Sequence, residues 1–316
     1  MNYYSTNGKA PIADLQKAVV KGLAEDRGLY MPERIEKLPK AFFDNIQDMK
    51  FQDIAYNVAS NFFGEDVDED ALQDIVYDTL SFDCPVVEVK DNIYTLELFH
   101  GPTLAFKDVG ARFMARLLGY FLRQESSKLV NVLVATSGDT GSAVANGFLG
   151  VEGIHVYVLY PKGKVSPIQE CQFTTLGQNI TAIEVDGVFD DCQALVKSAF
   201  MDEELNQHMK LTSANSINVA RFLPQAFYYF NAYARMKALG KADNLVMCVP
   251  SGNFGNICAA LFGHEKDYPS SASSLPTMPT MCSTIICRRV SMKLRQAYRH
   301  WPTLWTWATP RTLPAS

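Results

Sequence analysis

The chain has 316 residues, of which 47% are hydrophobic and 20% are charged, a composition ordinary for a soluble globular protein of about two domains. Its net charge of −5 offers no general argument for binding nucleic acid or an anionic membrane, and no apolar stretch approaches the roughly 18 residues of a membrane span. The N-terminus lacks the features of a signal peptide, and the seven scattered cysteines contain no CxxC pair, so we expect a cytoplasmic protein with reduced thiols and no metal site.

In the first third of the chain, the hydrophobic pattern predicts helices and one hairpin. Helices with one apolar face are expected over residues 12–24, 51–63 and 69–79. Two short apolar runs, 85–89 and 93–98, indicate a β-hairpin. A further helix is expected over residues 109–121.

From residue 129 onward, predicted strands alternate with predicted helices. The strands are expected over residues 129–135, 155–160, 180–185 and 244–249. The helices are expected over residues 142–149, 167–176, 190–200, 221–238 and 257–263. Ser166 is a suitable N-cap for the helix that starts at Pro167. This alternation predicts an α/β fold with an open, mostly parallel sheet that helices cover on both faces.

Lys107 is the most informative residue of the chain. It follows a Gly101-Pro102 turn and Phe106, and it precedes the helix expected over 109–121. A lysine enclosed in this way loses solvation, which lowers its pKa, so the amine can attack an aldehyde or act as a base. The spacing leaves one alternative equally open, a helix-capping lysine beside Asp108.

Two glycine-rich turns each connect a buried strand to a helix, over residues 136–141 and 250–256. Glycines let backbone N–H groups converge there, and the helix dipole favours an anion. Neither turn is a P-loop or a GxGxxG turn, and one such turn alone is weak evidence of anion binding. Together with Lys107, however, the two turns could hold a cofactor phosphate, a substrate carboxylate and a carbonyl carbon, which is what a pyridoxal phosphate enzyme needs.

Several motifs between residues 4 and 263 are shared with a known family. They are Ser5-Thr6, Gly22-Leu23-Ala24, residues 28–32, 97–108 and 136–141, Asn215-Ser216-Ile217-Asn218 with Arg221, and residues 251–256. On these motifs the chain resembles the threonine synthase family of pyridoxal-phosphate-dependent enzymes, which have the fold of the tryptophan synthase β-subunit (fold type II). The resemblance implies an N-terminal domain over residues 1–86 that includes a helical segment, and an incomplete α/β catalytic region over 87–263 with three layers around mostly parallel sheets.

The resemblance also implies roles for single residues. Lys107 is expected to be the catalytic residue and to form the Schiff base with pyridoxal 5'-phosphate. The cofactor phosphate is expected at Ser251, Gly252, Asn253, Phe254, Gly255 and Asn256. The substrate α-carboxylate is expected at Thr136, Ser137, Gly138, Asp139 and Thr140. Many relatives in the wider class have asparagine in place of Asp139, and an acidic group there disfavours a second anion.

Asn218 and Arg221 are implied candidates for binding a substrate phosphate, since arginine grips phosphate with two hydrogen bonds. Their equally open alternative is a capped helix start with a solvated arginine. His100 could orient the lysine loop, although a structural histidine fits as well. Lys162 and Lys164 are weaker candidates, because a solvated loop explains them better.

The implied reaction converts O-phospho-L-homoserine and water to L-threonine and phosphate, the last step of threonine biosynthesis. Two alternatives stay open: a related pyridoxal phosphate lyase such as a serine/threonine dehydratase, and an inactive, truncated product. The expected partner is the small-molecule substrate, with neither nucleic acid nor membrane, and the chain is expected to be a monomer or a homodimer.

After Gly263 the resemblance stops and the chain changes in character. Residues 264–316 hold all three tryptophans, and their basic residues outnumber the acidic ones by seven to two. Read from the third base of each codon, residues 300–310 can encode Leu-Ala-Asn-Ala-Met-Asp-Val-Gly-Asp-Pro, which resembles a segment of the family. We therefore expect a one-base frameshift near Glu265, in the gene or in its reported sequence, and an aberrant, disordered tail over 264–316.

Overall fold

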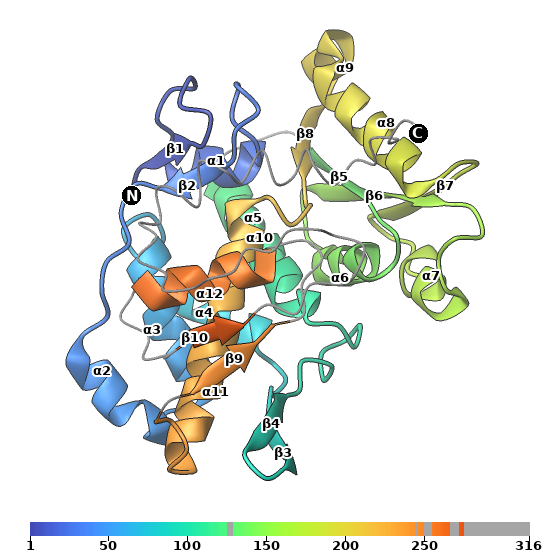
Figure 1. Cartoon of the computed structure of the whole chain (residues 1–316). Coiled ribbons are helices and arrows are strands. Elements are labelled where there is room, and N and C mark those ends of the chain that lie inside the picture. The colour runs from blue at the N-terminus through green and yellow to red at the C-terminus, as the bar shows by residue number, and fades with distance from the viewer. Residues whose placement is uncertain (125–128, 244, 250–254, 266–271, 275–316) are drawn as a thin grey trace, which may run out of the picture.

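A four-stranded parallel sheet with the order β7-β6-β5-β8 organises one half of the molecule (Figure 1). The computed structural model describes residues 1–124, 129–243, 245–249, 255–265 and 272–274. The strands of this sheet are β5 (Val130–Ala135), β6 (Ile154–Pro161), β7 (Ile180–Val185) and β8 (Lys210–Ser213). Val130 is paired with Ile154 on one side and with Lys210 on the other, so β5 is a central strand.

Helices cover both faces of this sheet, as the alternation predicts. Helix α8 (Phe189–Met201) packs on one face, where Cys192 and Val196 meet Ala135 and Leu159. Helices α6 (Asp139–Phe148) and α7 (Pro167–Thr174) pack on the other face. Alternate residues of β5 point to opposite faces, and this explains why nearly the whole strand is apolar and buried.

The other half of the molecule is mainly helical and is arranged around α5 (Lys107–Gln124). This helix packs on α6 beside the sheet and on α4 (Glu69–Thr79) and α10 (Val219–Phe222). Aromatic contacts join it to its neighbours, since the ring of Phe113 lies 5.1 Å from that of Phe63 and 5.9 Å from that of Phe227. The remaining helices of this half are α1 (Leu15–Lys21), α2 (Lys40–Asn45), α3 (Phe51–Phe63), α11 (Ala226–Ala238) and α12 (Gly255–Glu265).

Three small sheets and several short elements complete the described structure. Strands β1 (Tyr3–Ser5) and β2 (Tyr30–Pro32) are antiparallel, as are β3 (Val86–Lys90) and β4 (Ile93–Leu96), whereas β9 (Val246–Cys248) and β10 (Ala272–Ser274) are parallel. The short helices are η1 (Ile46–Asp48), η2 (Leu223–Gln225) and α9 (Glu203–His208).

The bounds of α3 and α4 are those that the hydrophobic pattern predicts, and Ser166 caps α7 as expected by accepting from the N–H of Gln169. The predicted helix over 12–24 is shorter, because the Asp14 side chain caps α1 and Gly22, at φ +72°, ends it. The prediction of a single helix over residues 221–238 is wrong. A 3₁₀ turn around Pro224 divides it into α10 and α11, since proline provides no N–H for an α-helical bond.

The sequence analysis did not foresee β8, the fourth strand of the sheet. Its residues, Lys210 to Ser213, are short and half polar, so they carry little hydrophobic signal, and only pairing with β5 makes them a strand. Elements β1, β2, α2, η1, α9 and β10 were not predicted either.

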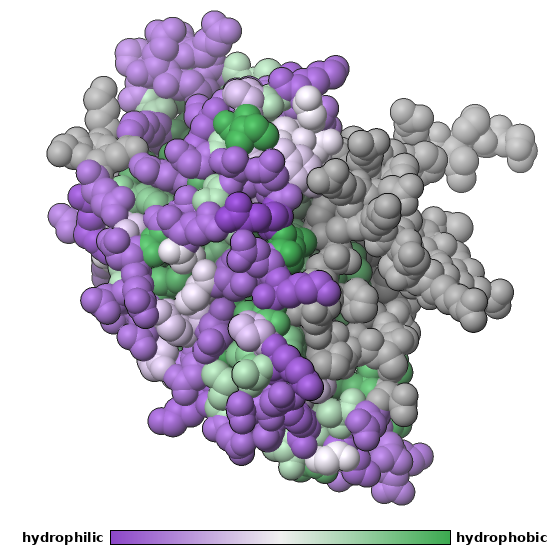
Figure 2. Space-filling view, turned by 90° about the vertical axis from the view of Figure 1, so that its left-hand side faces the viewer, coloured by the Kyte–Doolittle hydropathy of each residue, from purple (hydrophilic) through white to green (hydrophobic). Residues whose placement is uncertain are grey.

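Most of the segment predicted to be an aberrant tail, and with it the frameshift hypothesis, lies outside the described residues. The exceptions are the end of α12 and strand β10, which pairs with β9. In the part of the chain that the structure describes, no helix is long and apolar enough to cross a membrane. The face that carries α2 and the N-terminus is mainly hydrophilic where it is described, and its hydrophobic residues form small separate groups (Figure 2).

Candidate active site

Lys107 is the first residue of α5, and the loop before it is folded back onto the helix. The buried Asp108 carboxylate accepts hydrogen bonds from the N–H of Thr103, at 2.9 Å, and from the Thr103 hydroxyl. Gly101 must be a glycine, because a Cβ there would lie 2.4 Å from Oδ2 of Asp108. The loop and the first helical turn therefore form one unit that holds Lys107 in place.

The Lys107 amine is directed toward the first turn of α6. Its Nζ donates to Oδ1 of Asp139 at 3.0 Å and to Oγ1 of Thr140 at 2.7 Å, and it forms an ion pair with Asp139. Among the described residues, the hydrogen bonds and ion pair of the amine are made with Asp139 and Thr140, which does not support the alternative of a helix-capping lysine beside Asp108. Burial lowers the pKa of Lys107, and the positive charge of Arg221 adds to this, while Asp139 opposes it.

Thr136 shapes the turn between β5 and α6 from inside. Its hydroxyl oxygen accepts from the N–H groups of Gly138, at 2.9 Å, and Gly141, at 2.8 Å. Gly138 has φ +145°, a conformation that residues with a side chain rarely adopt. The N–H of Thr140 is also used, by Oδ1 of Asp139. These N–H groups therefore do not converge on a ligand as expected, and the exposed Ser137 is the part of the turn most open to one.

Arg221 is fully buried, and the structure does not satisfy its guanidinium. One nitrogen, Nη1, donates to the carbonyl of Ala214, while Nε and Nη2 have no partner among the described residues. Burial lowers the pKa of Arg221 to about 10, against the opposing charges of Asp139 and Asp108. A buried cation with two unpaired donors is costly, so an anion is the chemical group that would fit beside it. The predicted alternative of a solvated arginine is wrong.

Asn218 is a structural residue in this arrangement. Its Nδ2 donates to the carbonyls of Val19, at 2.9 Å, and Ser213, at 3.4 Å, and its Oδ1 caps α10 by accepting from the N–H of Ala220. Both amide hydrogens are thus used within the protein. The geometry corrects the expectation that Asn218 contacts a substrate phosphate, and it supports the helix-capping alternative.

The second glycine-rich turn is only partly described. Ser251, Gly252, Asn253 and Phe254 lie outside the described residues. Gly255 and Asn256 form the start of α12, where the helix dipole favours an anion. Gly255 lies beside Ser216, since a Cβ at Gly255 would be 3.7 Å from the Ser216 carbonyl oxygen. The start of α12 is therefore next to the segment that leads to Arg221.

The sheet explains why these residues meet. Strands β5 and β8 are parallel neighbours, so their carboxyl ends lie at the same edge of the sheet. The turn that carries Asp139 follows β5, and the segment that carries Arg221 follows β8. Ligands of open α/β sheets bind at this kind of edge.

Three weaker candidates lie apart from this site. His100 lies 2.7 Å from Glu97, and its ring is tilted against that of Phe99, which supports the alternative of a structural histidine. Lys162 is exposed and lies 4.0 Å from Glu184, as expected of a solvated loop. No contact of Lys164 with the residues around Lys107 is seen in the described structure.

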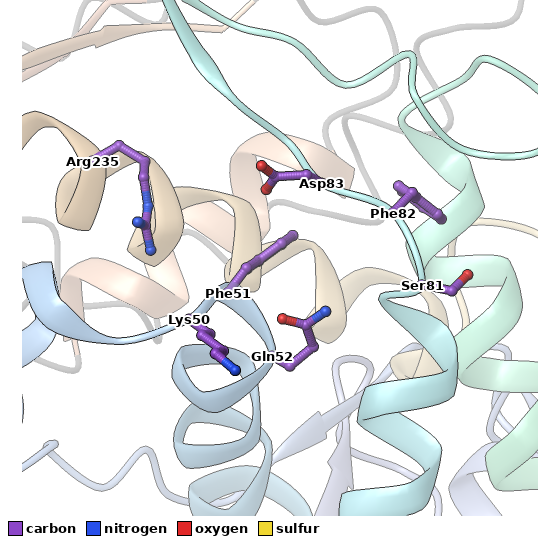
Figure 3. A pocket seen from close by; sticks show the side chains of 7 residues that line it. All are labelled: Lys50, Phe51, Gln52, Ser81, Phe82, Asp83 and Arg235. Carbon is purple, nitrogen blue, oxygen red and sulfur yellow. The ribbon is translucent and has the colours of Figure 1, made fainter.

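A cavity of about 350 Å³ lies elsewhere in the molecule (Figure 3). Its lining comes from the start of α3, the segment after α4 and one residue of α11: Lys50, Phe51, Gln52, Ser81, Phe82, Asp83 and Arg235. None of the residues that bond to the Lys107 amine borders this cavity. The candidate site is therefore defined by the Lys107 amine and the Arg221 guanidinium, and not by the cavity.

Sequence reasoning missed two residues that position the site. Asp108 was weighed only as a partner of Lys107, whereas its carboxylate holds the loop at Thr103. Tyr228 donates its hydroxyl to the carbonyl of Phe106 at 2.6 Å, across 122 positions of the chain. Nothing in the sequence around Tyr228 indicates this contact.

Comparisons with known proteins give a consistent result. The family model "Threonine synthase N terminus" matches residues 2–80, and the model "Pyridoxal-phosphate dependent enzyme" matches residues 78–285, which extends past Gly263, where the resemblance was expected to end. The chain is 43% identical to a threonine synthase of Serratia marcescens over 269 residues, which cover 85% of this chain and 62% of the relative. It is 42% identical to one of Buchnera aphidicola, covering 90% of this chain and 67% of the relative.

A solved structure shares the fold. A threonine synthase from Brucella melitensis, described as bound to PLP, superposes with a TM-score of 0.80 at 36% identity and covers 87% of this chain and 60% of that one. This likeness confirms the predicted fold class. The chain spans about three fifths of the length of the Serratia and Brucella proteins, at 62% and 60%.

Proposed function

Because the chain belongs to the threonine synthase family of pyridoxal-phosphate-dependent enzymes, we propose that its site converts O-phospho-L-homoserine and water to L-threonine and phosphate. One observation carries this proposal: a partly buried amine and a buried guanidinium with two unpaired nitrogens lie in one site, where burial and the charge of Arg221 lower the pKa of Lys107. The amine suits a carbonyl carbon, and the guanidinium suits a phosphate.

Among the described residues, Lys107 suits the aldehyde of pyridoxal phosphate, and Gly255 and Asn256 at the start of α12 suit its phosphate. Lys107 would bond to the aldehyde carbon, and the segment of Ser251, Gly252, Asn253, Phe254, Gly255 and Asn256 would hold the phosphate at the start of α12. When bound, the cofactor withdraws electrons from the amino acid attached to it. The rest of the chemistry depends on residues of this chain.

Lys107 moves the protons in this proposal. Its lowered pKa makes a neutral amine available to take a proton from the substrate α carbon and to transfer protons at the β carbon. Asp139 and Thr140 orient the amine through their hydrogen bonds to Nζ. The bond between the γ carbon and the phosphate oxygen breaks, and inorganic phosphate leaves. A proton taken from the β carbon is replaced by one delivered to the γ carbon, the hydroxyl of water adds at the β carbon, and a proton returns to the α carbon.

Substrate binding uses two anion sites in this proposal. Arg221 holds the substrate phosphate through Nε and Nη2. The substrate α-carboxylate binds the turn of Ser137, Gly138, Asp139 and Thr140 at the start of α6. Its contact is Ser137, the exposed residue of the turn, because the N–H groups of Gly138 and Thr140 are already used within the protein. Before any ligand binds, Lys107 offsets the charge of Asp139 through their ion pair.

Two assays test the proposal and separate it from a dehydratase. With pyridoxal phosphate present, release of inorganic phosphate and formation of threonine from O-phospho-L-homoserine support it. Formation of a ketoacid from serine or threonine, without reaction of the phosphorylated substrate, would refute it. Arg221 favours the first result, because a dehydratase substrate has no phosphate to pair with this cation.

The same assays address the inactive alternative. We would compare this chain with a version whose reading frame is shifted by one base after Glu265. Activity of the shifted version alone would mean that the site is correctly assigned and that this chain does not complete it. Inactivity of both, in folded protein with cofactor bound, would count against the proposed reaction.

A further inference from the structure

Helix α11 carries two neighbouring buried tyrosines, Tyr228 and Tyr229, whose hydroxyls reach different parts of the molecule. Tyr228 donates to the carbonyl of Phe106 at 2.6 Å, immediately before Lys107. Tyr229 donates to the carbonyl of Asn256 at 2.8 Å, in the first turn of α12. Successive side chains on a helix point roughly 100° apart, so adjacent tyrosines can contact two separate elements.

One carbonyl lies directly before a helix and the other lies in the first turn of a helix, and both helices bear on the site. The Phe106 carbonyl leads directly into α5, whose first residue is Lys107, and the Asn256 carbonyl is the second in α12. Loss of either hydroxyl would free one helix start from α11 without removing any group that would touch a ligand. Burial raises the pKa of both phenols, so both stay protonated donors over the working pH range.

The same stretch of chain also carries Arg221. It precedes α11 in α10, and its backbone carbonyl packs against Gly110 of α5, where a Cβ would come within 2.4 Å. Residues 219–238 therefore contact the lysine helix, the residue before it and α12. This stretch links the parts of the site that lie farthest apart in the sequence.

We infer that Tyr228 and Tyr229 are positioning residues that hold Lys107 and the start of α12 at a separation that matches a phosphate-bearing aldehyde. The inference rests on the proposed function, in which one rigid molecule is bonded to Lys107 at its aldehyde and held by α12 at its phosphate. A rigid ligand that is bound at both ends requires its two binding groups to stay at a fixed distance, because a small displacement of either group weakens one of the two contacts.

The test compares two aldehydes that differ only in the phosphate: pyridoxal phosphate and pyridoxal. Borohydride reduction followed by peptide mass analysis measures the fraction of Lys107 modified at each ligand concentration in wild type, Tyr228→Phe and Tyr229→Phe. We expect Tyr229→Phe to weaken binding of pyridoxal phosphate about three- to tenfold, the loss typical of one hydrogen bond, and to leave pyridoxal unchanged. Tyr228→Phe should weaken both aldehydes.

The matched control is Tyr120→Phe. Tyr120 is also buried, but at the far end of α5, and its hydroxyl donates to Asp68, away from the site. This variant should bind both aldehydes like wild type. Equal losses in all three variants, or no loss in either α11 variant, would overturn the inference. A wild type in which Lys107 is never modified would instead overturn the proposed function and the inference with it.

A second measurement needs no ligand. In Tyr228→Phe, amide hydrogen exchange should accelerate near residues 107–111 but not near residues 255–259. In Tyr229→Phe, it should accelerate near residues 255–259 but not near residues 107–111. Uniform acceleration across the chain would mean that the hydroxyls serve only general stability, which would contradict a positioning role.

Discussion

The amine of Lys107 and the carboxylate of Asp139 form a partly buried ion pair with Nζ–O distances of 3.0 Å, across 32 positions of the chain. Asp139 keeps the amine more basic than burial and Arg221 alone would make it. It also neutralises charge at the start of α6. Burial lowers the pKa of Lys107, and this pair opposes that shift at the residue on which the proposed chemistry depends.

Replacing Asp139 by asparagine should lower the pKa of Lys107 further. The carboxylate is the group that raises this pKa, and asparagine keeps the size and one acceptor without the charge. The measurement is the pH dependence of the reaction of Lys107 with pyridoxal, whose midpoint should move to lower pH. Thr140→Val is the control, since it removes a hydrogen bond to Nζ but no charge. A midpoint that rises in Asp139→Asn would contradict the assignment.

The lowered pKa of Lys107 should also appear in the stability of the protein. Between the folded pKa and the ordinary value of 10.5, the unfolded chain binds more protons at this lysine than the folded chain does. Stability therefore rises with pH in that window. The free energy of unfolding of wild type, minus that of Lys107→Met, should increase as urea unfolding is repeated from pH 7 toward pH 10. A difference that falls with pH would mean that the lysine is stabilised as a cation.

Arg221→Met should not destabilise the ligand-free protein strongly. Replacing a buried, poorly paired charge by an apolar side chain of similar length is often neutral or stabilising, so we expect a loss of less than about 1 kcal/mol or a gain. The variant should lose the rise in melting temperature that inorganic phosphate gives to wild type.

The control for this variant is Arg116→Met, at an arginine of α5 that pairs with Asp78. Phosphate should protect it as it protects wild type. Full protection of Arg221→Met by phosphate would show that the guanidinium does not bind the anion.

Alanine should destabilise the protein at one glycine of α5 and be nearly neutral at another. At Gly110 a Cβ would come within 2.4 Å of the backbone carbonyl of Arg221, which cannot move aside easily. Gly110→Ala should therefore cost about 1–3 kcal/mol. At Gly119 the nearest atom is a methyl group of Val151 at 3.3 Å, so the gain in helix propensity, up to about 1 kcal/mol, offsets most of the crowding. Chemical denaturation of both variants checks this, and equal effects would contradict the close contact of α5 with α10.

Local signals predicted much of the fold. The period of apolar residues placed α3 and α4 at their bounds, and the alternation of strands and helices predicted a parallel sheet covered on both faces. The failures have two causes, one local and one long-range. Pro224 interrupts a strong helical pattern, and β8 is a strand only because it pairs with β5.

The site divides in the same way. Glycines, a proline and a lysine in short motifs identified Lys107 and the turn after β5, because such residues determine local backbone and solvation. The sequence could not predict that Asn218 binds the carbonyls of Val19 and Ser213. Nor could it predict that two nitrogens of Arg221 lack a partner among the described residues. Those contacts depend on which groups, far apart in the sequence, the fold brings close together.

The sequence by itself determined the class of fold and the residue that carries the proposed chemistry. Only the tertiary structure decided which groups surround that residue. Parallel pairing of β5 with β8 brings Asp139 and Arg221 to one edge of the sheet, and the hydroxyl of Tyr228 reaches the peptide before Lys107. The charge, burial and pKa of the lysine follow from these long-range contacts, and no spacing along the chain encodes them.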